Sequence, residues 1–159
     1  ALARVVRHYP DCMLHVVDKD AKQAAMQTLA NALGLNSNVI FHGGKDNLEV
    51  QQLYGKADVF VMPSLIEGFG LVFLEAMAAA VPVIGGQCGG TPELITNGKN
   101  GFVVPPDDHE TLALRIIELV EHPALRQQMV LAGKESYALY SIDTMINQTV
   151  ELYRRFKKS

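Results

Sequence analysis

Short apolar segments alternate with segments of helical spacing along most of the chain, and this alternation restricts the fold more than any other feature. The apolar segments lie at residues 12–17, 38–43, 58–63, 81–86 and 101–106. They are rich in Val and Ile without regular polar alternation, as in strands covered on both faces. Helical spacing is found at residues 21–33, 48–56 and 71–80, and in a shorter stretch after Pro92. Strands that alternate with helices predict an α/β fold with a Rossmann-like, doubly wound parallel sheet.

The strand pattern stops after Pro105. Residues 107–140 and 143–158 are predicted to form closing helices at the C-terminus, the first of them broken at Pro123, because proline interrupts helical hydrogen bonding. We see no internal repeat and no linker. A length of 159 residues is typical of one domain, so the whole of 1–159 is predicted to be a single unit.

Composition excludes several classes of protein. A net charge of −3 and a pI near 5.9 argue against a nucleic-acid binder, which usually has a basic face. Cys12 and Cys88 lie far apart, which favours neither a disulfide framework nor a cysteine metal site, and predicts a cytoplasmic setting. No apolar run reaches the roughly 18 residues of a transmembrane helix, and no signal-peptide pattern opens the sequence.

The segment 63–86, PSLIEGFGLVFLEAMAAAVPVIGG, has the most specific pattern in the chain. A strand is predicted to lead through a glycine-containing turn into a helix that begins near Leu71. Gly68 and Gly70 lack Cβ atoms, so a ligand can approach the backbone closely. Free amides in the first turn of that helix would suit a phosphate. Glu75, little more than one turn in, could reach a sugar hydroxyl.

Each of these features also has a structural interpretation. The named phosphate motifs are absent, and a glycine turn before a helix is by itself a weak signal. Ser64 and Glu67 fit a capping box, in which the glutamate side chain only accepts a hydrogen bond from the backbone amide of the N-cap residue. Glu75 could instead lie at the solvent edge of its helix. From the residues alone, both alternatives stay open.

The two glutamates and their surroundings resemble a known family. Glu67 and Glu75 with the glycines after the first form an E-x7-E pattern that looks like the signature of group 1 retaining glycosyltransferases. The flanking segments 39–64 and 89–108, VIFHGGKDNLEVQQLYGKADVFVMPS and GGTPELITNGKNGFVVPPDD, agree with it. The resemblance covers roughly residues 11–120. It implies the C-terminal, donor-binding half of a GT-B fold.

The resemblance implies roles for the two carboxylates. Glu75 would accept hydrogen bonds from the ribose of a nucleoside diphosphate sugar. Glu67 would be the catalytic residue, close to the transferred sugar and the charge that develops at its anomeric carbon. The expected activity is that of a hexosyltransferase in polysaccharide or glycolipid synthesis, with the nucleotide sugar as co-substrate and no cofactor.

Backbone groups would hold the rest of the donor. By resemblance, the amides of Phe69 and Gly70 would hold sugar hydroxyls, and those of Leu71 and Val72 the distal phosphate. Fixed amides stabilise a departing diphosphate without reorganising.

Other segments of the sequence bear on the nucleotide base and on a possible metal ion. The loop that contains His42 and Gly43 is expected to pack against the base of the nucleotide. The histidines have no metal-ligand spacing, and no metal is predicted. Asp18 and Asp20 match a D-x-D metal pattern, but we interpret residues 18–20 as a solvated loop.

The sequence departs from the family in several places. Ala80 stands where a glycine is usual, and residues 18–23, DKDAKQ, replace a glycine-rich turn. Residues 1–11 resemble the helix that follows the first strand of such domains. That strand, its Arg/Lys pair and the N-terminal acceptor-binding domain are therefore expected to be missing, so that this chain alone should transfer no sugar. Peripheral membrane contact of the parent protein stays open.

Two other functions are compatible with the pattern. A sugar-nucleotide epimerase of GT-B build would use similar donor contacts for another reaction. A flavodoxin-like binding module without catalytic activity would explain the fold, but it would leave the paired glutamates without a role.

Overall fold

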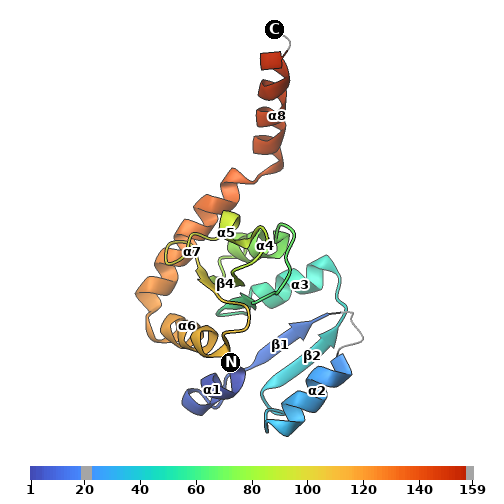
Figure 1. Cartoon of the computed structure of the whole chain (residues 1–159), viewed down its shortest axis with the longest axis vertical. Coiled ribbons are helices and arrows are strands. Elements are labelled where there is room, and N and C mark those ends of the chain that lie inside the picture. Colours follow the sequence, from blue (N-terminus) through green and yellow to red (C-terminus); the bar gives the residue numbers. More distant parts are fainter. Residues whose placement is uncertain (19–22, 157–159) are drawn as a thin grey trace.

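The computed structural model describes residues 1–18 and 23–156 and has the predicted α/β architecture (Figure 1). In chain order the elements are α1 Leu2–His8, β1 Leu14–Val17, α2 Gln23–Ala32, β2 Val39–Gly43, α3 Asn47–Tyr54, β3 Phe60–Met62, α4 Leu71–Ala78, β4 Val83–Gly86, α5 Thr91–Leu94, β5 Phe102–Val104, α6 His109–Glu121, α7 Pro123–Leu139 and α8 Ile142–Phe156. All five predicted strands are confirmed, each shorter than its apolar segment. The predicted helices are confirmed as well, including the break at Pro123.

Local chemistry explains where several helices begin. Asp46 caps α3 by accepting a 2.9 Å hydrogen bond from the amide of Glu49, whose side chain bonds back to the amide of Asp46. Asp108 caps α6 in a similar way, with a 2.9 Å bond from the amide of Thr111. These side chains satisfy amides that a first helical turn leaves without partners.

Strands β3, β4 and β5 form a parallel sheet in that order, and helices cover both of its faces. Neighbouring residues of β4 point to opposite sides: Val83 packs into a core with α4 and α5, and Ile84 into a second core with α6 and α7. Both side chains are fully buried. This part of the molecule is the doubly wound sheet that the apolar strand segments predicted.

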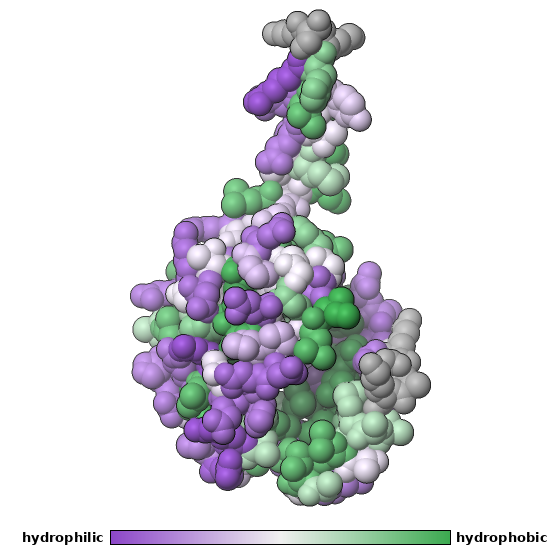
Figure 2. All heavy atoms as spheres, viewed as in Figure 1, coloured by the Kyte–Doolittle hydropathy of each residue, from purple (hydrophilic) through white to green (hydrophobic). Residues whose placement is uncertain are grey.

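Strands β1 and β2 form a separate parallel pair. Coverage on both faces was expected for every strand, and for β1 this is wrong: Leu14 is 39% and Val17 37% exposed. The reason is that none of the cores formed by the described residues includes a residue of β1, so no packed layer covers these side chains. Strand β1 also pairs only with β2, and its other edge has no strand beside it within residues 1–18 and 23–156. Figure 2 shows a recess between the two parts of the molecule, with hydrophobic residues along it.

The helices outside the sheets differ in how much they bury. Helix α1 packs on α6 through Val5, Ala113 and Ile117, and α7 packs on both α6 and α4. Helix α8 extends away from the body, and none of its residues is buried (Figure 1). Its exposed apolar side chains are Ile142, Met145, Ile146, Val150, Leu152, Tyr153 and Phe156. Among the residues that the structure describes, no helix is long and apolar enough to cross a bilayer.

Candidate functional site

The loops that follow β3 and β4 meet at the carboxyl ends of these strands. The amide of Gly90 donates a 3.1 Å hydrogen bond to the carbonyl of Gly68, and the Cys88 thiol donates a 2.9 Å bond to the carbonyl of Ser64. A Cβ atom at Gly86 would lie 2.6 Å from the same Ser64 oxygen. The loop of residues 63–70 is therefore held against the loop of residues 87–90.

Gly89 brings the second loop against Glu67. Its φ is +49°, and a Cβ there would collide with the Glu67 carbonyl. Gly68 and Gly70 could be singled out from the sequence, whereas the glycines at the end of β4 and in the loop after it were missed. Their signal is the pair of Gly-Gly steps at 85–86 and 89–90, because glycine is required where two backbones touch.

Helix α4 begins with backbone amides that have no acceptor among the described residues. Gly70 is the N-cap with φ 86° and ψ 44°, and a Cβ there would lie 2.7 Å from the buried ring of Phe73. Gly68, in contrast, does not have a positive φ. Within the described residues, the amides of Phe69, Gly70, Leu71 and Val72 have no hydrogen-bond acceptor. The backbone thus presents a row of donors where the helix dipole also favours negative charge.

Glu67 is not a helix cap. Helix α4 begins at Leu71 rather than after Ser64, and it has no side-chain cap. The capping-box interpretation is therefore wrong. Glu67 is half-buried close to the start of α4, and its side chain has no hydrogen bond to any described residue. Within the described residues, this carboxylate therefore forms no hydrogen bond or ion pair that would stabilise the fold.

Glu75 lies on the exposed face of α4. Its neighbours Leu74 and Ala76 point into the core, so the helix places a carboxylate in an apolar run without burying it. The Tyr54 hydroxyl lies 3.4 Å from Oε2 of Glu75 and 3.3 Å from the carbonyl oxygen of Val72. Burial, followed by the charge of Glu75, raises the pKa of Tyr54, and its hydroxyl stays protonated as a donor.

His42 and Gly43 lie at the end of β2. The Nε2 atom of His42 is 2.8 Å from Nδ1 of His15, and the two rings stack with their centroids 5.1 Å apart. The carbonyl of Gly43 accepts a 3.2 Å bond from the amide of Asp18. His42 therefore has a side-chain partner, His15, that the sequence did not indicate.

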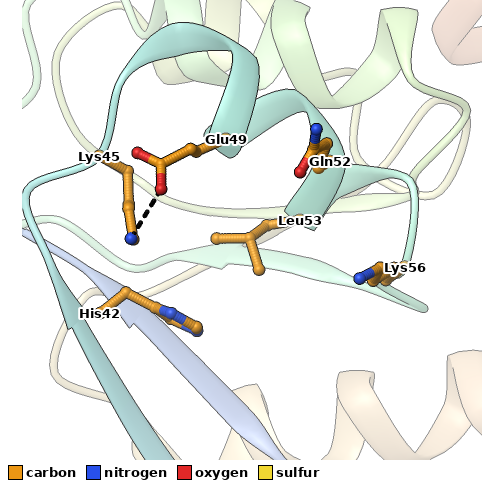
Figure 3. A pocket seen from close by; sticks show the side chains of 6 residues that line it. All are labelled: His42, Lys45, Glu49, Gln52, Leu53 and Lys56. Carbon is orange, nitrogen blue, oxygen red and sulfur yellow. Dashed lines mark hydrogen bonds and ion pairs between the residues drawn. The ribbon is translucent and has the colours of Figure 1, made fainter.

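A pocket opens beside His42, against α3 and the turn that follows it (Figure 3). It is lined by His42, Lys45, Glu49, Gln52, Leu53 and Lys56. The Lys45 ammonium and the Glu49 carboxylate are 2.8 Å apart across its rim, and this hydrogen bond is the main reason why the pKa of Glu49 is lowered. The lining therefore offers hydrogen-bond donors from its two lysines and acceptors from Glu49 and Gln52.

The predicted site residues fall into two groups. Glu67, Phe69, Gly70, Leu71, Val72 and Glu75 surround the start of α4, whereas His42 and Gly43 belong to the β1–β2 pair. Leu71 is 63% exposed, and the ring of Phe69 packs edge-on against Tyr140 at 5.8 Å.

No described set of three or more His, Cys, Asp or Glu side chains could hold a metal. Lys19 and Asp20 of the D-x-D pattern lie outside the described residues.

Comparison with known proteins identifies the relatives of this chain. The family model described as "Glycosyl transferases group 1" matches residues 1–136. A GDP-mannose-dependent alpha-(1-6)-phosphatidylinositol monomannoside mannosyltransferase of Mycolicibacterium smegmatis is 34% identical over 141 residues, which are 84% of this chain and 37% of the relative. The chain thus spans well under half the length of this curated relative.

Solved structures agree. Sucrose-phosphate synthase from Thermosynechococcus elongatus superposes with a TM-score of 0.82 and 30% identity over 99% of this chain and 42% of its own. The C-terminal domain of a glycosyl transferase group 1 family protein from Francisella tularensis gives a TM-score of 0.76 and 28% identity, over 87% of this chain and 76% of that one.

Proposed function

This chain belongs to the group 1 glycosyl transferases, and on that premise we propose that it is the donor-binding half of a retaining hexosyltransferase. Its co-substrate would be a nucleoside diphosphate sugar and its product a polysaccharide or glycolipid. The name of the mannosyltransferase relative, which is GDP-mannose-dependent, supports this class of donor. The comparisons do not favour an epimerase or a non-catalytic flavodoxin-like module.

One observation carries the proposal: at the start of α4, several amides and the half-buried carboxylate of Glu67 lie close together, and none of them has a hydrogen-bond partner among the described residues. The N-terminus of a helix binds phosphate because its amides and its dipole both face the anion. The leaving diphosphate gains charge as the bond to the sugar breaks. Preorganised amides stabilise that charge without reorganising, and this kind of effect is often the largest in catalysis.

The donor would extend from α4 toward β2. The amides of Leu71 and Val72 would bind the distal phosphate, and those of Phe69 and Gly70 the hydroxyls of the sugar. Glu75 would accept from the ribose hydroxyls. The base would lie near His42 and Gly43, where the pocket of Figure 3 offers polar side chains.

The chemistry needs no base from this chain. The bond between the anomeric carbon and the phosphate oxygen breaks, and the acceptor oxygen bonds to the same face of that carbon. The proton of the acceptor hydroxyl passes to the departing phosphate. Glu67, close to the sugar, would hold its hydroxyls and stabilise the positive charge at the anomeric carbon.

We further infer that one more parallel strand, from the rest of a longer protein, completes the sheet between β1 and β3. Both strands have an unpaired edge within residues 1–18 and 23–156. The starts of the two strands interact electrostatically: the pKa of Cys12, before β1, is raised mainly by partial burial and also by the charge of Asp58, before β3. A doubly wound sheet of order 3-2-1-4-5-6 has its first strand in this place.

A longer protein would also supply the acceptor-binding half. Positioning donor against acceptor can contribute about 7–11 kcal/mol to catalysis. We therefore expect the 159-residue chain to bind nucleotide weakly and to transfer no sugar until the other half is added. Hydrogen exchange at β1 and β3, fast in this chain and slow in the longer protein, would test the additional strand.

Calorimetric titration tests the donor site. Uridine, guanosine and adenosine diphosphates are compared on the wild type, Glu75→Ala and the control Glu135→Ala, which removes an exposed glutamate of α7. One diphosphate should bind, and Glu75→Ala should weaken it by about 1.5–3 kcal/mol, the range for hydrogen bonds to a charged group. The control should bind as the wild type does. If no nucleotide binds, or if both variants lose the same affinity, the donor-site assignment is wrong.

A further inference from the structure

Tyr54 links the end of α3 to the first turn of α4. Only 7% of the residue is exposed, and its ring packs edge-on against Phe60 with the centroids 5.5 Å apart. Phe60 packs in the same way against the fully buried Phe73 of α4. The ring of Tyr54 is thus held on one side by aromatic packing, and this determines where its hydroxyl points.

The hydroxyl reaches two acceptors that belong to the same turn of α4. It lies 3.3 Å from the carbonyl oxygen of Val72 and 3.4 Å from Oε2 of Glu75. One hydroxyl carries one proton, so these two oxygens share it. The amide of Val72 is also one of those that would bind the distal phosphate in the proposed function. The contact therefore joins the carboxylate and the amide row through one rigid side chain.

We propose that Tyr54 is a positioning residue, which holds the Glu75 carboxylate in the orientation that accepts the ribose hydroxyls of the donor. This rests on the proposed function, in which Glu75 binds ribose. An exposed glutamate samples several rotamers, and ordering it reduces the net affinity of a ligand. Tyr54 removes part of that cost before the ligand arrives. Because α3 also forms a wall of the pocket beside His42, the same side chain sets α4 relative to that wall.

The variant that isolates this role is Tyr54→Phe, which keeps the ring and removes only the hydroxyl. Its matched control is Tyr9→Phe. The Tyr9 hydroxyl donates to Oε1 of Glu121 at 3.1 Å, a second tyrosine–glutamate contact that joins α1 to α6 outside the site. Each variant loses one tyrosine–glutamate contact; the Tyr9 contact is exposed and the Tyr54 contact is partly buried, so Tyr9→Phe controls for the removal of a tyrosine hydroxyl outside the site.

Two ligands separate positioning from structure: the nucleoside diphosphate that binds, and its 2′,3′-dideoxy counterpart, which lacks the hydroxyls that Glu75 would meet. Tyr54→Phe should weaken the first about 3- to 10-fold, the effect of one hydrogen bond, and leave the second within twofold. Tyr9→Phe should change neither. Equal weakening of both ligands, or unchanged affinity for both, would overturn the positioning role while the donor site itself stands.

A second measurement requires no ligand. Urea unfolding of Tyr54→Phe, Glu75→Ala and the double variant gives the coupling between hydroxyl and carboxylate. The double variant should lose less stability than the sum of the single variants. Additive losses would show that the contact is absent and would end the proposal. If the wild type binds no diphosphate, the donor-site function fails, and this cycle still decides whether Tyr54 holds Glu75.

Discussion

The C-terminus of α4 offers a test in which one substitution should stabilise the protein. After the C-cap residue Ala79, Ala80 adopts φ +63°, and it is the one described non-glycine residue with positive φ. Its amide bonds to the carbonyl of Met77 at 3.1 Å, and the amide of Val81 bonds to that of Ala76 at 2.9 Å. These are the two bonds of a Schellman motif, in which the left-handed residue is usually glycine.

The same motif ends α2, with glycine in the equivalent place. Gly34 has φ +69°, its amide bonds to Asn31 at 3.1 Å, and the amide of Leu35 bonds to Ala30 at 2.9 Å. A Cβ added to Gly34 would meet no atom within 4 Å. An alanine at Gly34 would therefore cost stability through its backbone conformation and not through a clash. Ala80→Gly and Gly34→Ala make opposite changes at equivalent positions of the same motif.

The magnitude follows from two opposing effects. The left-handed conformation costs an L-residue about 1–2 kcal/mol. Glycine lowers the stability by about 0.4–1 kcal/mol, because it increases the conformational freedom of the unfolded chain. Ala80→Gly should therefore stabilise the fold by about 0.5–1 kcal/mol, and Gly34→Ala should destabilise it by a similar amount.

Urea unfolding measures both variants, with Ala79→Gly as the control. Ala79 has φ −77°, a conformation in which glycine gains nothing, so that variant should lose stability. The midpoint for Ala80→Gly should rise with an unchanged slope, which indicates a change in stability alone. A fall in the midpoint, or equal effects at Ala79 and Ala80, would refute the assignment of strain to Ala80.

Three further outcomes are expected. Glu67→Ala should leave the binding of a bare nucleoside diphosphate nearly intact and weaken that of the complete sugar nucleotide; equal losses would remove Glu67 from the sugar site. Chelation of divalent ions should barely change nucleotide affinity, because amides and a helix N-terminus face the phosphates, whereas strict metal dependence would revive Asp18 and Asp20 as ligands. The hydroxyl and amide of Thr111 lower the pKa of Asp108, so its cap stabilises the fold fully above the ordinary aspartate pKa and is lost as the pH falls through the lowered value. The difference in thermal midpoint between wild type and Asp108→Ala should accordingly shrink below about pH 4, the ordinary aspartate range, and a constant difference would contradict this.

Local patterns in the sequence were sufficient for the order of the elements and for the start of the site. Apolar Val- and Ile-rich segments predicted all five described strands, because these residues favour strands; burial on both faces, which was also expected, holds for β4 and not for β1. The break at Pro123 and the turn at Gly70 depend on the backbone chemistry of single residues. The glutamates 67 and 75 could be selected because their spacing and the glycines between them are visible without a structure.

Contacts between distant segments were decided only by the tertiary structure. Whether the side chains of β1 are covered depends on which elements pack on its faces, and the apolar residues of β1 are the same with those faces packed or exposed. The partners His15 and His42, Tyr54 and Glu75, and the loops joined by Gly68 and Gly90 come from different elements. No local pattern specifies these contacts, because each depends on the packing of whole helices and strands that brings two remote backbones together.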